Sequence, residues 1–339
     1  MLYLMKKKIG LVIQGPLLSI GRAGNKLHES PEKLLREGGL VHYDCRPNIE
    51  RLITDFGSLF DEIVVSTWDN ELKPGDGWQG VKLISVPDPG GIKQPNSYKD
   101  NNKHRQFIST LNGLNELEKN GIDYAVKMRT DMYLDLKKLT ESFFAGIESN
   151  KKPNIIYATV IHRPTFLLHD IYFAAHLRAL KEFCEAILAY DKFEFMPSVH
   201  REIVLKPAHV LYKGAINVPD WAYFPMWPPD GISAATRKIF EYMFDNVFFA
   251  LDPEVFRSTL WRGVYYDEDH VSGLVEVKDS RPRKYNLPGL VCTDWERYFH
   301  FRLQISGKKI TFVAKIIIKI GKLGWKLWNL IRKVVRMVR

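Results

Sequence analysis

Residues 123–134, Asp-Tyr-Ala-Val-Lys-Met-Arg-Thr-Asp-Met-Tyr-Leu, decide most of what can be predicted about this chain. The apolar run in this stretch indicates a buried strand, and Arg129 and Asp131 follow it with Thr130 between them. In open α/β sheets, ligands bind at the carboxyl ends of the strands. A carboxylate beside a cation at that position is typical of a metal-bridged diphosphate site, because Mg²⁺ takes one or two protein carboxylates and completes its shell with phosphates and water. A buried Arg–Asp ion pair with a structural role fits the spacing equally well.

Strand-like and helix-like segments alternate around this stretch. Short apolar runs predict strands, and apolar side chains at helical spacing predict helices. The predicted strands are 8–14, 62–68, 81–86 and 123–134, and the predicted helices are 48–60 and 101–119. This alternation favours an α/β fold with a mostly parallel sheet flanked by helices on both faces. Further along, residues 154–160 are predicted as a strand and residues 172–189 as a helix.

The excess positive charge of the chain, which is +10, lies at its C-terminus. Residues 308–339 contain ten Lys and Arg and no Asp or Glu, so residues 1–307 balance at 39 against 39. The basic side chains of this tail share one helical face, and apolar side chains, with Trp325 and Trp328, cover the rest. Lysines interrupt the tail too often for a bilayer span, which needs about 20 mostly apolar residues. We therefore expect a C-terminal amphipathic basic helix that lies on an anionic membrane surface.

Two other interpretations of the tail are a docked terminal helix and a nucleic-acid-binding arm. We divide the chain into one domain over residues 1–307, with a candidate subdomain over residues 214–307, and a membrane-binding tail over residues 308–339.

Cysteine usage and the N-terminus favour a cytoplasmic location. Cys45, Cys184 and Cys292 are far apart and form no C-x-x-C pattern, which favours a reducing compartment over a disulfide framework. The apolar run that follows the first lysines is too short for a secretory signal peptide.

Polar residues follow the first two predicted strands. Gln14 and Gly15 end the first, but no G-x-G-x-x-G or G-x-x-x-x-G-K-[ST] motif follows, which disfavours dinucleotide dehydrogenases and P-loop enzymes. A tight turn explains these two residues as well as a nucleotide-binding loop does. Ser66 and Thr67 end the next strand, where hydroxyl groups could hold a base or a ribose.

Two further candidates lie near predicted helices. Arg105 and Gln106 open the helix predicted over residues 101–119, where backbone N–H groups and the guanidinium favour an anion; a solvated first turn explains them equally well. Asp170 lies inside an apolar run, and burial would raise its pKa and suit it to general base catalysis. The alternative, which spacing alone favours, is that Asp170 caps the following helix.

Five short blocks occur in the same order as in a known family. They are VIQGP (12–16), VVSTW (64–68), RQFIST (105–110, with Gly113), KMRTD (127–131) and HD (169–170) before aromatic residues. Together they resemble the WavE family, which is associated with bacterial lipopolysaccharide core synthesis, and they span roughly residues 8–185. Ala174 departs from the glycine that such proteins often carry after the aromatic run, which weakens the link to Asp170.

The resemblance implies a glycosyltransferase of GT-A-like architecture. In that architecture a strand-end acidic motif, often D-x-D, holds the diphosphate of a nucleotide sugar through a divalent cation, Mg²⁺ or Mn²⁺. Arg129 stands at the first position of that motif here, so Asp131 alone is the predicted metal ligand, and direct contact of Arg129 with the diphosphate is the alternative. Asp170 is the implied general base of an inverting mechanism, whereas a retaining mechanism needs no such base. The implied nucleotide-sugar-binding residues are Gln14, Gly15, Ser66, Thr67, Arg105, Gln106 and Arg129.

The implied acceptor is a lipid-linked glycan at the inner face of the bacterial inner membrane, where the tail would hold the enzyme. A second interpretation keeps the fold but transfers a sugar phosphate or a polyol phosphate from a nucleotide donor. A third is a non-catalytic protein that binds membranes or nucleic acid through its tail. Charge neutrality over residues 1–307 counts against nucleic acid as a partner of the globular part.

Overall fold

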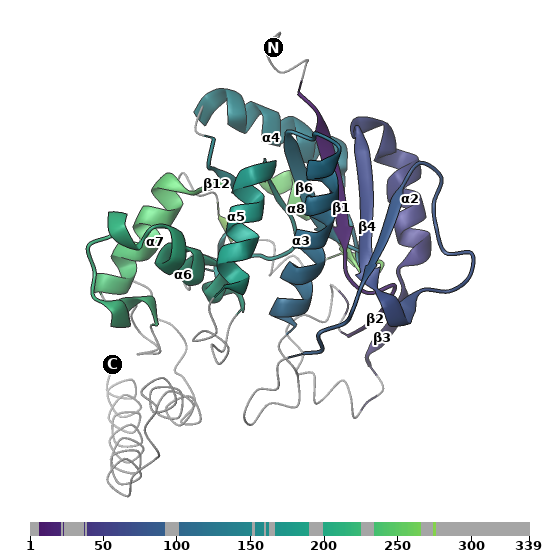
Figure 1. Ribbon diagram of the computed structural model, residues 1–339, viewed down its shortest axis with the longest axis horizontal. Coiled ribbons are helices and arrows are strands. Elements are labelled where there is room, and N and C mark those ends of the chain that lie inside the picture. The colour runs from purple at the N-terminus through teal and green to yellow at the C-terminus, as the bar shows by residue number, and fades with distance from the viewer. Residues whose placement is uncertain are drawn as a thin grey trace, which may run out of the picture.

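The computed structural model describes residues 7–21, 23, 37, 39–91, 102–150, 153–158, 161–162, 167–189, 199–224, 234–265 and 274–275. A seven-stranded sheet in the order β12-β8-β11-β6-β1-β4-β5 organises this part of the chain (Figure 1). Its strands are β1 (Ile9–Gln14), β4 (Glu62–Trp68), β5 (Lys82–Val86), β6 (Tyr124–Arg129), β8 (Ile156–Ala158), β11 (Phe173–His176) and β12 (Phe248–Ala250). β11 runs antiparallel to both of its neighbours, and every other pairing in this sheet is parallel.

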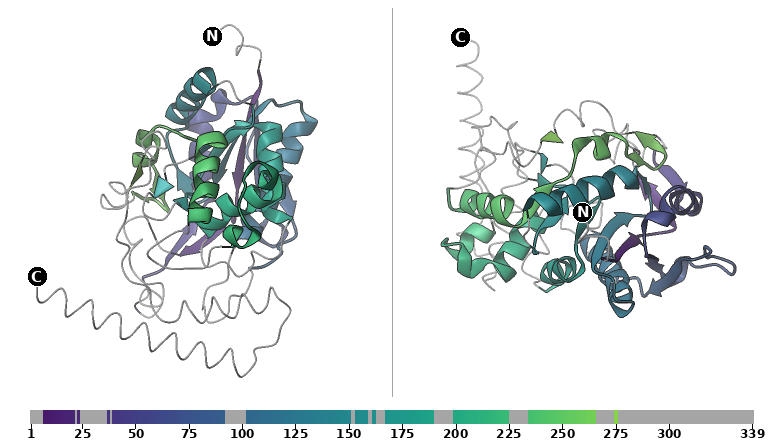
Figure 2. Two further views of the ribbon diagram at one scale, coloured as in Figure 1. Left: turned by 90° about the vertical axis from the view of Figure 1, so that its left-hand side faces the viewer. Right: turned by 90° about the horizontal axis from the view of Figure 1, so that it is seen from above.

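Helices connect the parallel strands and cover both faces of the sheet (Figure 2). One face carries α3 (Lys103–Lys119), α5 (Leu177–Leu188), α6 (Val199–Leu211) and α7 (Ala234–Asn246), and the other carries α2 (Arg46–Phe56), α4 (Leu136–Asn150) and α8 (Pro253–Arg257). Successive side chains of β1 enter opposite cores: Val12 packs with the first set of helices, and Leu11 and Ile13 pack with the second. A Cβ atom on Gly113 would lie 2.5 Å from Val12 Cγ1, so glycine lets α3 lie close against β1.

Short strands and turns complete the fold. β2 (Leu18–Gly21) pairs with β3 (Val41–Asp44), β7 (Met132–Tyr133) pairs with β13 (Leu260–Trp261), and β13 pairs with β14 (Val264–Tyr265). β9 (Ile161–His162) pairs with β10 (Leu167–Leu168) and β15 (Leu274–Val275). Short 3₁₀ turns are η3 (Gly57–Leu59), η4 (Asp69–Glu71), η7 (Lys213–Ala215) and η8 (Asp220–Tyr223).

The predicted α/β fold with a mostly parallel sheet flanked by helices is confirmed. The strand predicted over residues 123–134 is in fact β6, a turn at Thr130 and Asp131, and β7. The helix predicted over residues 172–189 is wrong in its first part, because β11 precedes α5.

Where it is described, the predicted subdomain over residues 214–307 contributes strands to two sheets: β12 pairs with β8 in the seven-stranded sheet, and β13 pairs with β7 in a separate three-stranded sheet. The predicted tail, residues 308–339, lies outside the described residues. None of the helices that are described combines the length and the apolar character needed to cross a membrane.

Candidate active site

Three neighbouring strands end side by side. Gln14, at the end of β1, is in register with Ser66 of β4 and with Arg129 of β6. Because these strands are parallel, their carboxyl ends form one edge of the sheet, on the side where β2 and β3 lie (Figure 1).

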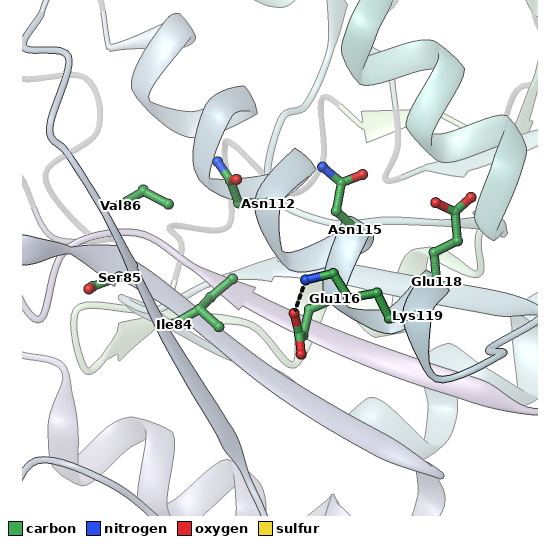
Figure 3. Close-up of a pocket in the computed structure, with 8 residues that line it drawn as sticks. All are labelled: Ile84, Ser85, Val86, Asn112, Asn115, Glu116, Glu118 and Lys119. Carbon is green, nitrogen blue, oxygen red and sulfur yellow. Dashed lines mark hydrogen bonds and ion pairs between the residues drawn. The ribbon is translucent and has the colours of Figure 1, made fainter.

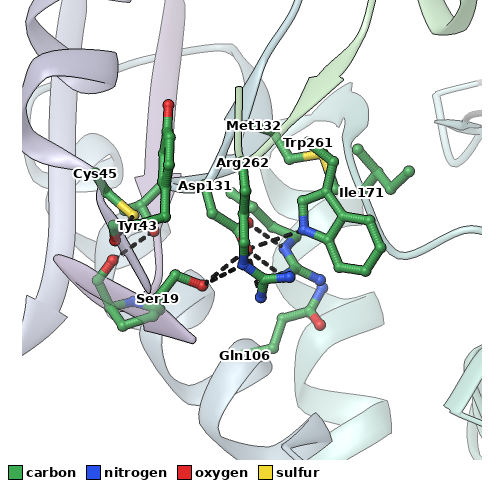
Figure 4. Close-up of polar contacts among 12 residues, drawn as sticks. Ser19, Tyr43, Cys45, Gln106, Asp131, Met132, Ile171, Trp261 and Arg262 are labelled. Atoms are coloured by element: carbon green, nitrogen blue, oxygen red, sulfur yellow. Dashed lines mark hydrogen bonds and ion pairs between the residues drawn. The ribbon is translucent and has the colours of Figure 1, made fainter. Parts of the chain in front are cut away.

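Asp131 lies just beyond this edge, and its side chain is 1% exposed. Arg129 donates from Nε to Oδ1 and from Nη2 to Oδ2, each at 2.9 Å. Ser19 Oγ donates to Oδ2 at 3.0 Å, Trp261 Nε1 donates to it at 3.1 Å, and Arg262 Nη2 lies 3.1 Å from it. We name these five residues the Asp131 cluster; Figure 4 labels four of them, Ser19, Asp131, Trp261 and Arg262.

A two-residue turn brings Arg262 to this cluster. Arg262 and Gly263 connect β13 to β14 with φ values of +51° and +78°, the pattern of a type I′ turn. A side chain in this left-handed conformation costs about 1–2 kcal/mol, so arginine is an unfavourable choice for the turn itself. Two hydrogen bonds offset this conformational cost. The Arg262 backbone N–H donates to the Asp131 carbonyl at 2.9 Å, and the Arg262 Nε donates to Ser19 Oγ at 3.0 Å.

The Asp131 carboxyl is ionised. Burial alone would raise its pKa, but the guanidiniums of Arg129 and Arg262 outweigh burial and hold the pKa well below its usual range. The nearby Cys45 thiol stays protonated, because burial, together with the charge of Asp131, raises its pKa to about 12. The five residues of the cluster thus include one carboxylate and two guanidiniums.

The donor set at Asp131 does not fit a divalent cation. An ionised carboxylate has about four lone-pair sites, and both oxygens already accept from arginine, hydroxyl and indole donors. Two unit charges about 4 Å apart interact by about 4 kcal/mol at an effective dielectric constant of about 20. The two guanidiniums beside Asp131 would oppose the attraction of a dication to this carboxylate.

The described residues also contain no group of three His, Cys, Asp or Glu side chains that could hold a metal ion. The metal role predicted for Asp131 stays a prediction, and the donors that already contact its carboxylate speak against it.

Asp170 reaches the same edge from the opposite direction, because β11 begins beside the end of β6. It precedes a strand, and His176 is the N-cap residue of α5, so the predicted capping alternative is wrong. Asp170 is 8% exposed. Its carbonyl accepts from Gln106 Nε2 at 2.7 Å and from Lys127 Nζ at 2.5 Å, which ties its backbone to α3 and to β6.

Lys127 is fully buried inside β6. Burial lowers the pKa of its amine to about 7, although the nearby Asp170 acts in the opposite direction. Its Nζ also lies 5.2 Å from the centroid of the Phe173 ring. An amine with a pKa near neutrality can change its protonation state under working conditions.

The strand-end hydroxyl groups of β4 are buried. Ser66 and Thr67 have no exposed surface, and Ser66 Oγ accepts a hydrogen bond from Ser109 Oγ of α3 at 3.0 Å. This geometry gives Ser66 a packing role between β4 and α3. The contact of Ser66 and Thr67 with a nucleotide stays a prediction, and their burial speaks against it.

Gly15 shapes the loop that follows β1. Its φ is +129°, and a Cβ atom there would lie 2.8 Å from Thr130 Oγ1, so only glycine fits. Gln14 beside it is 3% exposed, and its carbonyl accepts from the Thr130 backbone N–H at 3.0 Å. These contacts fix the backbone next to Asp131, whereas nucleotide binding by Gln14 and Gly15 stays a prediction.

The first turn of α3 lies along the same edge. The Arg105 guanidinium lies 5.2 Å from the centroid of the Trp68 ring and forms an ion pair with Asp88, in the loop after β5. The next residue, Gln106, is labelled in Figure 4, and its Nε2 donates to the Asp170 carbonyl. The structure thus brings Gln106 to Asp170, while Arg105 holds the loop that follows β5.

A shallow hollow of about 520 Å³ lies elsewhere, between the edge strand β5 and α3 (Figure 3). Asn112, Asn115, Glu116 and Lys119 line its helical side. Glu116 accepts from Lys119 at 2.8 Å, as the dashed line shows. None of the predicted site residues lines this hollow.

Sequence reasoning missed Ser19, Lys127, Trp261 and Arg262. The Arg262-Gly263 pair between short apolar runs was a usable signal, since glycine in a two-residue loop indicates a hairpin. A lysine inside the apolar run of β6 was a second signal. Ser19 left no signal, because its role depends on tertiary contacts with the Asp131 cluster.

Comparisons with solved structures give only loose similarities. A structure described as a mannose-1-phosphate geranyltransferase from Thermus thermophilus is 15% identical, with coverage of 55% of this chain and 66% of that chain and a TM-score of 0.31. A CMP:2-keto-3-deoxy-manno-octonic acid synthetase complexed with CTP is 13% identical, with coverage of 53% and 78% and a TM-score of 0.31.

A glycosyltransferase involved in glycosylation of the major capsid of PBCV-1 is 10% identical, with coverage of 73% of this chain and 82% of that chain and a TM-score of 0.29. TM-scores this low carry no argument about function.

No protein of curated function matches the chain. One family model does match, over residues 57–169, and its description is WavE lipopolysaccharide synthesis. The matched segment contains α3, β6 and the Arg129-Thr130-Asp131 turn. Over residues 57–169 the chain therefore matches the family described as WavE lipopolysaccharide synthesis, which confirms the resemblance drawn from its motifs.

Proposed function

We propose that this protein is a transferase of bacterial lipopolysaccharide or envelope polysaccharide synthesis, which moves a sugar from a nucleotide-sugar donor to a lipid-linked glycan acceptor. The observation that carries the proposal is the WavE match over residues 57–169, which includes the end of β6. Ligands of open α/β sheets bind at this edge. The basic Asp131 cluster and Asp170 both lie there.

The donor end of the reaction is assigned to Arg129. Its side chain is 25% exposed, and Asp131 fixes the guanidinium by two hydrogen bonds. Negative charge develops on the leaving diphosphate as the bond to the sugar breaks. A cation that is already held in place stabilises this charge without reorganisation, which lowers the barrier to transfer.

The acceptor end is assigned to Asp170. In an inverting reaction its carboxylate takes the proton of the acceptor hydroxyl while that oxygen attacks the anomeric carbon. The hydrogen bonds from Gln106 and Lys127 to the Asp170 carbonyl hold the segment that presents this carboxylate. Gln106 and Lys127 therefore act as positioning residues for Asp170.

The location is proposed from the tail. A lipid-linked acceptor lies at a membrane, and the basic amphipathic segment 308–339 is suited to an anionic surface. We place the catalytic domain at the cytoplasmic face of the inner membrane on this basis.

The test is a screen of nucleotide sugars with detection of the released nucleotide. We expect one donor to give a nucleoside diphosphate, and Arg129→Met and Asp170→Asn each to lower kcat/KM by about 10²-fold or more. Arg178→Met, at a side chain that is 83% exposed on α5, is the matched control and should leave the rate unchanged.

The released nucleotide also separates two reactions. With a nucleoside-diphosphate sugar as the donor, sugar transfer leaves the β-phosphate on the nucleotide and releases a nucleoside diphosphate. Sugar-phosphate transfer moves the β-phosphate with the sugar and releases a nucleoside monophosphate. Release of the monophosphate would replace the proposal by the second reaction, and no turnover with any nucleotide sugar and lipid extract would contradict both.

A further inference from the structure

The hollow between β5 and α3 has one polar wall and one aliphatic wall (Figure 3). Asn112, Asn115 and Glu116 line the wall that α3 forms, and Ile84 and Val86 line the wall that β5 forms. The volume of about 520 Å³ is in the range of small-molecule sites, which is about 300–1,000 Å³. A polar wall opposite a small aliphatic one suits a ligand with many hydrogen-bonding groups and little charge.

The two asparagines of the hollow have hydrogen-bonding groups to spare. Asn112 Nδ2 donates to the Ile108 carbonyl at 2.9 Å, and within the described residues Asn112 Oδ1 accepts no hydrogen bond. The Asn115 amide has no hydrogen-bond partner in the part of the chain that is described. Both amides project from the same side of α3 (Figure 3). An amide combines an acceptor oxygen with two N–H donors, so the pair can serve a ligand that both donates and accepts.

The charged side chains that line the hollow all have partners of opposite charge. Glu116 pairs with Lys119 at 2.8 Å and with Lys82 at 3.6 Å, and Glu118 pairs with Lys181. The hydrogen bond from Lys119 holds the pKa of the Glu116 carboxyl below its usual range, so this group is an ionised acceptor. Paired charges favour a neutral ligand over an ionic one.

Helix α3 connects the hollow to the candidate active site. Arg105, Asn112 and Asn115 are seven and three residues apart, which places them on one face of the helix. In the first turn, Gln106 donates to the Asp170 carbonyl at 2.7 Å. Asn112 follows Gln106 by six residues, which is about 9 Å of helix. A chain of sugars that reacts beside Asp170 can therefore extend along α3 to the hollow.

We propose that this hollow is an accessory binding site for the glycan acceptor, in which sugars remote from the reacting hydroxyl bind to Asn112 and Asn115. This inference rests on the proposed function. The neighbouring hydroxyl groups of a sugar donate and accept hydrogen bonds, and an amide matches both roles. Binding of remote sugars contributes to kcat/KM although these sugars do not touch the reacting atoms.

The test measures binding of core oligosaccharide, released from bacterial lipopolysaccharide by mild acid, to the full-length protein by calorimetry. We expect the double variant Asn112→Ala/Asn115→Ala to weaken binding by about tenfold or more. Alanine favours helix, so α3 should form as in the wild type. Asn246→Ala is the matched control, because the exposed Asn246 on α7 also donates to a carbonyl one turn earlier in its helix; it should bind as the wild type does.

A kinetic measurement distinguishes remote binding from damage to the active site. The double variant should raise KM for the core oligosaccharide by about tenfold and leave kcat unchanged. With a monosaccharide acceptor, which is too short to reach the hollow, kcat/KM should be the same for the double variant and the wild type. Equal losses with the long and the short acceptor would contradict an accessory site.

The outcomes separate this inference from the proposed function. If the core oligosaccharide does not bind, or binds equally to the double variant, the inference is overturned, while sugar transfer by the wild type would keep the proposed function. A change in oligomeric state of the double variant with unchanged oligosaccharide binding would assign the hollow to a second copy of the chain instead. Binding that the double variant weakens, without transfer from any nucleotide sugar, would support the glycan site and contradict the proposed function.

Discussion

At Asp131, a single carboxylate accepts from two arginines, a serine and an indole inside the protein. Asp131→Asn would leave two guanidiniums beside a neutral group, and removal of one partner from a buried ion pair costs about 3–5 kcal/mol. We expect a loss of that size in the free energy of unfolding, measured by urea denaturation. Asp245→Asn, at an exposed position on α7, should change stability by less than about 0.5 kcal/mol. Equal losses in the free energy of unfolding for the two substitutions would contradict the ion pairing of Asp131 in the cluster.

Lys127 makes stability depend on pH. Burial lowers its folded-state pKa to about 7, whereas a lysine in an unfolded chain titrates near about 10.4. Between these values the unfolded chain binds more protons than the native protein, so the free energy of unfolding contributed by Lys127 rises with pH from about 7 to about 10. Below about pH 7 both states are protonated, and the contribution is constant at its lowest value.

The measurement compares Lys127→Met with the wild type by urea denaturation between about pH 6 and about pH 9. The stability of the wild type relative to the variant should increase across this range. Lys138→Met, at an exposed position on α4, should show no such trend relative to the wild type. A flat difference for Lys127→Met would show that the amine is not desolvated.

At the scale of elements, the turn between β13 and β14 holds Arg262 at a positive φ, which is unfavourable for any residue except glycine. Arg262→Ala and Arg262→Gly both remove the ion pair to Asp131, but only glycine adopts a positive φ without cost. We expect Arg262→Gly to be more stable than Arg262→Ala by about 1 kcal/mol in thermal or chemical unfolding. An alanine variant as stable as the glycine variant would mean that the type I′ turn does not form.

A buried ion cluster anchors α3 against α6. Lys103 Nζ lies 2.7 and 2.6 Å from the carboxylate oxygens of Glu202, and Lys206 Nζ lies 3.7 Å from the same group, with all three side chains at most 1% exposed. Lys103 begins α3, so this cluster fixes the helix turn from which Gln106 reaches Asp170. Rigid support of this kind is what a catalytic constellation needs.

The elements were predictable where their sequence pattern is strong. β1, β4 and α3 form near their expected bounds, because buried parallel strands are continuous apolar runs and α3 has helical spacing. The helix prediction for residues 172–189 was wrong in its first part, because Phe173-Ala-Ala-His is too short an apolar run to distinguish a strand from a helix by periodicity. Pairing with β6 on one side and β8 on the other decides for a strand, and that information is tertiary.

At the scale of the whole molecule, the candidate site was only half predictable. Arg129 and Asp131 are close in sequence, so their pairing could be expected, but Ser19 and Trp261 reach Asp131 only after β2 and β13 are in place. Sequence spacing contains no information on such contacts. The second guanidinium beside Asp131, which speaks against the predicted metal role, comes from Arg262, far along the chain.

The last prediction concerns how the charge is divided along the chain. Residues 1–307 carry 39 basic and 39 acidic side chains, whereas residues 308–339 carry ten basic and none acidic. Attraction to an anionic surface should therefore reside in the tail, with about 1 kcal/mol contributed by each basic residue near that surface. Deletion of residues 308–339 should abolish sedimentation with phosphatidylglycerol vesicles and leave nucleotide-sugar hydrolysis largely intact. Vesicles of phosphatidylcholine alone are the control and should retain less of the full-length protein, because only the apolar face then contributes. Retained binding of the truncated protein to anionic vesicles would place the membrane contact on residues 1–307 instead.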